Sequence, residues 1–129
     1  MELVKNDPKY WEFIRLLRNM DGIREGFIKQ EIISKEHHEE YMKKKSTFFY
    51  ILLDKGIPIC YIGSIDNDIR VATHPDHQGK GAATFAVNEL MKIHPKAMAK
   101  VKINNKASLR LFEKCGFKKK YYLLEKDEA

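Results

Sequence analysis

The chain has 129 residues, of which 43% are hydrophobic and 33% charged, and its formal net charge is +6. This length is enough for one ordinary hydrophobic core, so we expect a single domain over residues 1–129 without disulfides or a structural metal. The longest apolar runs are much shorter than the ~20 residues of a membrane span. No signal-peptide core precedes them, which predicts a cytoplasmic protein with no membrane partner.

The two cysteines, Cys60 and Cys115, are far apart in the sequence and form neither a CxxC pair nor a zinc-site spacing with histidine. We interpret both as buried thiols and expect no metal. The excess of basic residues favours anionic partners, either phosphate-bearing small molecules or nucleic acids. Because the sequence has no RNP-like, zinc-finger or helix-turn-helix motif, nucleic-acid binding is not expected.

The N-terminal third predicts helices. Asp7 and Pro8 form an N-cap with proline at the first helical position, and an apolar stripe follows. The stretch 20–33 contains two glycines and predicts a short helix or a loop that could form part of a substrate wall. Ser34 then precedes a helix whose first turns are acidic and whose end is Lys43–Lys45, which matches the helix dipole at both ends.

The middle of the chain predicts a β-meander. Two β-rich runs, 47–53 and 58–65, flank Asp54-Lys55-Gly56 and indicate an antiparallel hairpin. A third strand is expected at 69–73, because the apolar run there ends before a proline.

The C-terminal half predicts alternating helices and strands. A helix begins in small residues after Gly79 and ends before His94-Pro95. The stretch 97–103 predicts a strand, 106–115 a short helix with a Schellman-type cap, and 121–124 the last strand. The order of elements predicts an α/β (α+β) fold in which helices flank one central sheet.

The stretch from Val71 to Thr84 is the most informative about function. It predicts a strand, a tight turn and a helix that begins in small residues, where unpaired amides and the positive end of the helix dipole attract an anion. Glycine and alanine leave room there for phosphate oxygens. We therefore predict a pyrophosphate site on the backbone amides of residues 78–84, although Gly79-Lys80-Gly81 alone is equally compatible with a flexible turn.

The same stretch does not fit the Walker or GxGxxG motifs. It resembles instead the acetyl-coenzyme-A signature of the GNAT N-acetyltransferases, (Arg/Gln)-x-x-Gly-x-(Gly/Ala), with Gln78, Gly81 and Ala83 in the fixed positions. Residues 105–117 resemble the second signature of that family, in which an asparagine, a small residue and an aromatic residue precede Gly-Phe.

The resemblance covers residues 47–124 and implies an acetyl-coenzyme-A-dependent N-acetyltransferase. It implies a mixed, mostly antiparallel sheet in which the fourth and fifth strands splay apart. The coenzyme-binding residues that it implies are Ala72, Thr73, Gln78, Gly79, Lys80, Gly81, Ala82, Ala83, Thr84, Asn105, Ser108 and Phe112.

The N-terminal third resembles the GNAT branch that acts on nucleotide-linked amino sugars, which often shows Trp-Arg-Asn and then Ile-Ser-x-Glu-x-His-x-x-Trp. The matching stretches are 17–19 and 33–41, although Leu17 and Tyr41 replace the tryptophans. The first hypothesis for the acceptor is therefore a small-molecule primary amine, an amino sugar on a nucleotide carrier. A protein or nucleic-acid amine and a catalytically degenerate acyl-coenzyme-A-binding module are the alternatives, and a homodimer is left open.

The resemblance also implies that the amine attacks the thioester in a ternary complex, while a backbone amide near Thr73 stabilises the oxyanion. The amine must lose its proton, and His74 and His38 are candidate bases because histidine titrates near neutral pH, although a lone histidine is more often structural. Where many family members have a tyrosine that protonates the leaving thiolate, this chain has Phe112, which has no proton to donate. The candidate substitutes are Ser108, Tyr121 and Tyr122.

Overall fold

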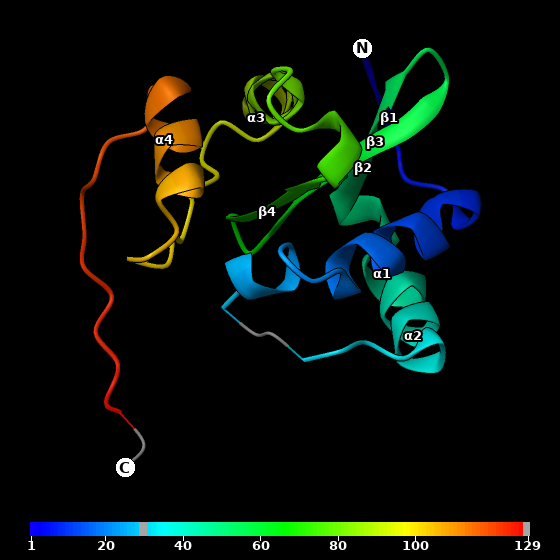
Figure 1. The fold of residues 1–129 in the computed structure, drawn as a ribbon, viewed down its shortest axis with the longest axis horizontal. Helices are drawn as coiled ribbons and strands as arrows, with labels where there is room; N and C mark the ends of the chain where they lie inside the picture. Colours follow the sequence, from blue (N-terminus) through cyan, green and yellow to red (C-terminus); the bar gives the residue numbers. More distant parts are fainter. Residues whose placement is uncertain (29–30, 128–129) are drawn as a thin grey trace.

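A computed structural model describes residues 1–28 and 31–127 of the chain. Its centre is an antiparallel sheet in the order β1-β2-β3-β4 (Figure 1). The strands are β1 (Glu2–Lys5), β2 (Phe49–Asp54), β3 (Ile57–Ile65) and β4 (Asp68–Thr73). The α-helices are α1 (Trp11–Asn19), α2 (Lys35–Lys45), α3 (Ala82–Ile93) and α4 (Lys106–Lys114). Short 3-10 turns cover Pro8–Tyr10, Arg24–Gly26, Ser46–Phe48 and Pro75–His77.

Two tight turns set the register of the sheet. Lys55-Gly56 joins β2 to β3 and Asp66-Asn67 joins β3 to β4, and all four residues have positive φ. Two consecutive residues with positive φ are typical of the type I′ turn, whose twist matches that of paired strands. The resulting register places Tyr61 of β3 opposite Ala72 of β4.

Helices cover both faces of the sheet. Figure 1 shows α3 on one side and α1 and α2 on the other, and α4 packs beside α3. The core beneath α3 contains Leu52, Cys60, Ile62, Ala86, Val87 and Leu90. The core beneath α1 and α2 contains Ile14, Leu17, Met42, Phe49, Ile51 and Tyr61. This arrangement confirms the predicted α/β fold class with helices on both faces of one sheet.

The side chains of β4 alternate between these two layers, as the pleat of a strand requires. Ile69 and Val71 contact the core beneath α3, whereas Ala72 belongs to the core beneath α1 and α2. Arg70 faces the same side as Ala72. The strand therefore presents two apolar side chains to the layer of α3, and a small residue and a cation to the layer of α1 and α2.

Local signals in the sequence position the N-terminal helices. The Asp7 carboxylate accepts a hydrogen bond from the Lys9 amide at 3.1 Å and caps the 3-10 turn that leads into α1. The Ser34 hydroxyl accepts a hydrogen bond from the His37 amide at 3.2 Å and caps α2. Both predicted N-caps are confirmed.

Three features of the sheet differ from the prediction. The short strand β1, which pairs with β2, was not predicted, because its four residues mix charged and apolar side chains. The strand predicted at 97–103 is wrong: within it only Met98 pairs, in a single parallel bridge with Asp68. The resemblance implied a fourth and a fifth strand that splay apart. The structure contains β4, and this single bridge stands in the place of the fifth strand.

The strand predicted at 121–124 is also wrong. Residues 118–127 form no regular element, and Tyr121 and Tyr122 are each more than 90% exposed. High β-propensity in a short run does not make a strand unless a neighbouring strand supplies hydrogen bonds and a packing surface.

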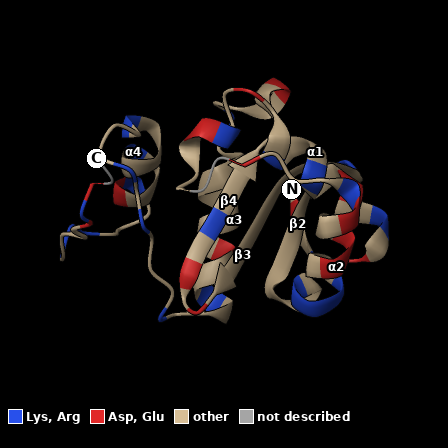
Figure 2. Cartoon of the chain, turned by 90° about the horizontal axis from the view of Figure 1, so that it is seen from below, with Lys and Arg blue, Asp and Glu red and all other residues tan. Residues whose placement is uncertain are grey.

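Charged residues are spread over the molecule. Figure 2 shows basic and acidic segments interspersed on the helices, with lysines at the C-terminal end of α2. In the described ranges, no helix combines the length and the apolar character needed to cross a lipid bilayer.

Candidate active site

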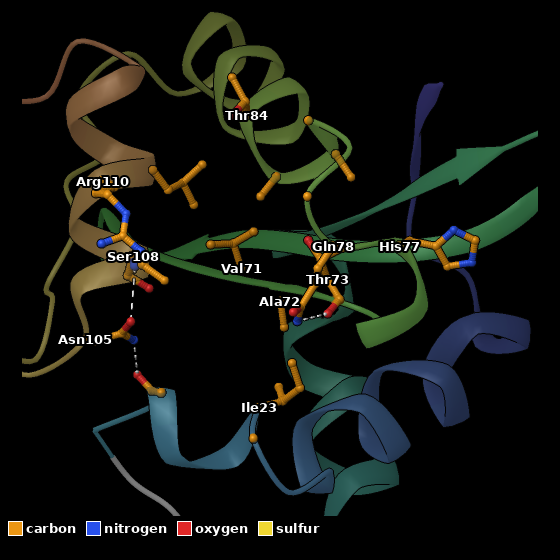
Figure 3. Close-up of a pocket in the computed structure, with 18 of the residues that line it drawn as sticks. Ile23, Val71, Ala72, Thr73, His77, Gln78, Thr84, Asn105, Ser108 and Arg110 are labelled. Carbon is orange, nitrogen blue, oxygen red and sulfur yellow. Dashed lines mark hydrogen bonds between the residues drawn. The ribbon is translucent and has the colours of Figure 1, made fainter.

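Of two cavities in the described part of the chain, the larger has a volume of about 720 Å³ and is open to solvent. Figure 3 shows it between β4, the N-terminal end of α3, the N-terminal part of α4 and the segment that contains Ile23. Ten residues predicted to bind the coenzyme line it: Ala72, Thr73, Gln78, Gly79, Gly81, Ala82, Ala83, Thr84, Asn105 and Ser108. The fold therefore brings both sequence signatures to one cavity.

The turn before α3 has the geometry of an anion-binding loop. Gly79 and Gly81 have φ of 78° and 82°, a region that other residues rarely adopt. A Cβ atom built on either glycine would meet no heavy atom within 4 Å, so open space lies beside the backbone. Gly81 is the N-cap of α3 without a side-chain cap, and the first amides of a helix have no intrahelical partner. These residues fit a pyrophosphate group.

A side chain of the turn ties it to the end of β4. The side-chain amide of Gln78 donates a hydrogen bond to the Thr73 carbonyl at 3.1 Å (Figure 3). His77 also lines the cavity, although no sequence pattern pointed to it. The turn and the strand thus form one connected wall.

Thr73 is the last residue of β4, and its side chain is buried. Its hydroxyl oxygen has no nitrogen or oxygen hydrogen-bond partner among the described residues, and the polar group beside it is the Cys60 thiol, which bonds only weakly. Buried hydroxyls without a partner are uncommon, since desolvation without a hydrogen bond costs about 1–3 kcal/mol. Because Thr73 lines the cavity, a bound molecule could supply the missing partner.

The start of α4 closes the cavity on the opposite side. The Asn105 side chain accepts a hydrogen bond from the Ser108 amide at 3.1 Å, which caps α4, and donates one to the Gly26 carbonyl at 3.5 Å. Lys102 also donates to the Glu25 carbonyl at 2.9 Å. The stretch 20–33, predicted to contribute to a substrate wall, therefore borders the same cavity as the coenzyme signatures in its described part.

Two residues predicted to contact the coenzyme lie elsewhere. Lys80 is exposed on the turn and does not line the cavity. Phe112 is buried, and its ring centroid lies 5.2 Å from that of Phe117. The Phe117 amide donates to the Phe112 carbonyl at 2.9 Å, as the C-terminal cap of α4 predicts. Their coenzyme contacts stay predictions.

The two candidate bases lie in different surroundings. The Nδ1 atom of His74 accepts a hydrogen bond from the Asp76 amide at 3.2 Å, and His74 lines neither described cavity. The Nε2 atom of His38 lies 2.7 Å from the Trp11 carbonyl, to which it must donate its proton. Burial lowers the pKa of His38, so the neutral ring with a lone pair on Nδ1 is favoured.

His38 borders a second cavity, of about 250 Å³, between α1, α2 and the sheet. The residues that line this acceptor-side cavity are Ile14, Arg18, Ile33, His37, His38, Tyr41, Met42, Phe49, Tyr61 and Arg70. Sequence reasoning missed Arg70. A cation in the middle of the apolar run Ile69–Ala72 was the signal that could have identified it.

The profile described as Acetyltransferase (GNAT) family matches residues 11–117. The chain belongs to the GNAT family of acetyltransferases. Membership confirms the predicted family and the predicted reaction, in which an acetyl group moves from acetyl-coenzyme A to an amine. The pyrophosphate-compatible turn lies within the matched region.

Solved structures share the GNAT fold at low sequence identity. A spermidine N-acetyltransferase from Vibrio cholerae, in complex with coenzyme A and spermine, is 20% identical with a TM-score of 0.83, over 97% of this chain and 85% of that chain. A ribosomal-protein-alanine N-acetyltransferase from Brucella melitensis is 13% identical with a TM-score of 0.77, over 92% and 85%. A Salmonella typhimurium protein with its cofactor acetyl-coenzyme A is 17% identical with a TM-score of 0.74, over 91% and 79%.

Among the curated proteins, no sequence matches this chain. Two of these structures are named for different acceptors, spermidine and a ribosomal-protein alanine, and none of the three belongs by its name to the branch that acts on nucleotide-linked sugars. That branch stays a hypothesis.

Proposed function

We propose that this GNAT enzyme acetylates the primary amine of an amino sugar on a nucleotide carrier, by direct attack in a ternary complex. The observation that carries the proposal is that β4 borders both cavities. Val71 and Thr73 line the larger cavity, and Arg70 lines the smaller one. Two substrates can therefore approach one strand from different sides, as a direct transfer requires.

The state of the cysteines supports direct attack. An acyl-enzyme route needs an activated nucleophile. Cys60 is fully buried, and burial raises the pKa of its thiol to about 12. Burial also raises the pKa of the Cys115 thiol, so the reactive thiolate of either is a minor species at neutral pH.

The surroundings of the second cavity support an amino-sugar acceptor. The stretch that resembles the sugar-specific branch contributes Ile33, His38 and Tyr41 to its lining. Of the two positions that depart from the branch, Tyr41 keeps an aromatic ring beside the cavity, whereas Leu17 is buried in the core. The replacement of tryptophan by Leu17 therefore affects packing in the core. The replacement of tryptophan by Tyr41 changes a residue that would contact the acceptor.

Each residue has a distinct task in the proposed reaction. Acetyl-coenzyme A supplies an acetyl group on a thiol leaving group. The amides of 82–84 hold the pyrophosphate, and a backbone amide near Thr73 stabilises negative charge on the carbonyl oxygen. His38 accepts the amine proton at Nδ1, relayed by water from the amine near Thr73. A thiol with a pKa near ~8.5 leaves without full protonation, so a side-chain acid in place of Phe112 is not required. Ser108, which lines the larger cavity, is the candidate if one acts.

The test is a thiol-release assay with a panel of acceptors, with the acetylated product identified by mass. We expect turnover of a nucleotide-linked amino sugar and little turnover of spermidine or of a peptide with a free N-terminus. The Cys60→Ala and Cys115→Ala variants should retain activity. Turnover of the peptide alone would refute the acceptor, and loss of activity in either soluble, folded cysteine variant would refute direct attack.

A further inference from the structure

The acceptor-side cavity has positive charge on two of its walls. Arg18 reaches it from α1 and Arg70 from β4, and its lining contains no aspartate or glutamate within the part of the chain that the structure describes. Its 250 Å³ correspond to roughly eight water molecules at about 30 Å³ each. This volume is large enough for one charged group and a few atoms bonded to it. A whole nucleotide is too large and would extend out of the cavity.

Arg70 stands on a strand that is otherwise apolar between its ends. Its Nη1 atom donates a hydrogen bond to the Tyr41 hydroxyl at 3.4 Å. None of the ion pairs formed by residues 1–28 and 31–127 includes Arg70. A partly buried cation is costly unless it is paired, so its place beside a cavity points to an anion from outside the chain.

An aromatic ring contacts the guanidinium group of Arg18. The guanidinium carbon lies 3.6 Å from the ring centroid of Phe27, a cation–π contact that helps to hold the charge of Arg18 beside the cavity. Burial is the main cause that lowers the pKa of Arg18, and the charge of Arg70 acts in the same direction. The two cations therefore repel each other across the cavity, and a bound anion would relieve this repulsion.

We infer that the acceptor-side cavity binds the anionic group of the acceptor, a phosphate, between Arg18 and Arg70. The identity of the acceptor rests on the proposed function, and the inference adds which residues hold its charged end. Forked guanidinium groups bind two phosphate oxygens at once. From Arg70 to Thr73 the strand rises by about 10 Å, at ~3.4 Å per residue, so a sugar attached to that phosphate can extend toward the larger cavity.

The same charges determine which amines are excluded. A polyamine carries several ammonium groups, which two fixed guanidinium groups repel. We therefore expect this enzyme to differ in acceptor from the Vibrio cholerae structure that contains spermine, although the two folds superimpose with a TM-score of 0.83. Specificity would lie in the charge of the cavity, since the fold is shared.

Calorimetric titration with uridine diphosphate tests the inference, with coenzyme A present at saturation so that the larger cavity is filled. The wild type should bind the probe, and Arg70→Met should weaken binding by tenfold to a hundredfold, the range of one lost charge-assisted hydrogen bond. Arg70→Lys should fall between them, because it keeps the charge and loses the fork. Lys92→Met, which removes an exposed cation from α3, is the control for net charge.

The results of these titrations distinguish a phosphate site from a carboxylate site and from no anion site. Equal binding by wild type and a folded Arg70→Met variant would overturn the inference, as would the absence of binding to the wild type. Binding of succinate but not of uridine diphosphate would show a carboxylate site and overturn the phosphate assignment. Arg70-dependent binding without turnover of any nucleotide-linked amino sugar would overturn the proposed function and leave this inference standing.

Discussion

The side-chain amide of Gln78 donates a hydrogen bond to the backbone carbonyl of Thr73 at 3.1 Å. This contact joins the glycine-containing turn before α3 to the end of β4, five residues earlier in the chain. The turn is thereby fixed relative to the strand along which the coenzyme arm is expected to lie. Preorganised backbone amides bind an anion more tightly than amides that must first be ordered.

Replacement of Gln78 by alanine should loosen the turn. A hydrogen bond contributes about 1 kcal/mol, so the KM for acetyl-coenzyme A should rise roughly fivefold while the melting temperature changes little. Steady-state kinetics with varied acetyl-coenzyme A measure this change. Gln78→Glu should be worse than Gln78→Ala, because it loses the donor and adds a negative charge beside the phosphates. An unchanged KM in both variants would contradict the role of the contact.

Gly81→Glu should abolish coenzyme binding, because it places a carboxylate in the space proposed for the pyrophosphate. The change also has a structural cost, since Gly81 has φ of 82° and a left-handed residue with a side chain costs about 1–2 kcal/mol. Titration with coenzyme A, together with a melting curve, separates the two effects.

Gly56→Glu is the matched control for that experiment. Gly56 has φ of 80° in the turn between β2 and β3, and a Cβ there also meets nothing within 4 Å. It should lower the melting temperature as much as Gly81→Glu does and leave coenzyme affinity unchanged. If both variants lost affinity equally, the loss would reflect stability and the proposed site would be wrong.

Thr73→Val should separate stability from activity. In the described chain the buried Thr73 hydroxyl has only the weakly bonding Cys60 thiol beside it, so its removal should change the free energy of unfolding little. If the bound coenzyme supplies the missing partner, kcat/KM for acetyl-coenzyme A should fall about tenfold, which corresponds to about 1.4 kcal/mol. Thr73→Ser keeps the hydroxyl and should show the opposite pattern, with lower stability and near-normal kcat/KM.

Features that depend on neighbouring residues in the sequence could be predicted. The N-caps at Asp7, Ser34 and Asn105 each act on an amide two or three residues away. The glycines of the turn before α3 were identified in the same way, because positive φ is a local requirement. These local signals were sufficient to place the helices that carry both coenzyme signatures.

Features that depend on distant residues could not be predicted. Arg70 meets Tyr41, which is 29 residues away, only after β4 has paired with β3 and α2 has packed across the sheet. The runs 97–103 and 121–124 have strand-like composition, yet apart from Met98 they find no partner strand in the described structure. Composition indicates that a run can form a strand, whereas pairing depends on the whole fold.

Asn105 should have two separable functions. Asn105→Ala removes the cap of α4 and should cost about 1 kcal/mol of stability. Asn105→Ser keeps a capping oxygen and should recover most of that stability. Both variants lose the donor to the Gly26 carbonyl, so both should raise the KM for acetyl-coenzyme A if this bridge holds the cavity wall. A normal KM in Asn105→Ser would assign Asn105 to capping alone.

His38 should make stability depend on pH. Burial lowers its pKa in the folded protein below the usual 6.5, so the unfolded chain takes up the proton first as the pH falls. The stability contributed by neutral His38 is therefore complete above pH 6.5 and is lost as the pH falls from there through the lowered folded pKa. His38→Gln, which can still donate to the Trp11 carbonyl, should flatten this part of the stability curve. Urea unfolding at a series of pH values measures the effect.

The control is His37→Gln, which removes the exposed neighbouring histidine from the same helix and should leave the slope of the wild-type curve unchanged. If His38 is also the proposed base, His38→Gln should lower kcat at pH 7 while the KM for acetyl-coenzyme A stays the same, because the coenzyme cavity does not include His38. A flattened stability curve with normal kcat would assign His38 to packing against Trp11 and would require another base.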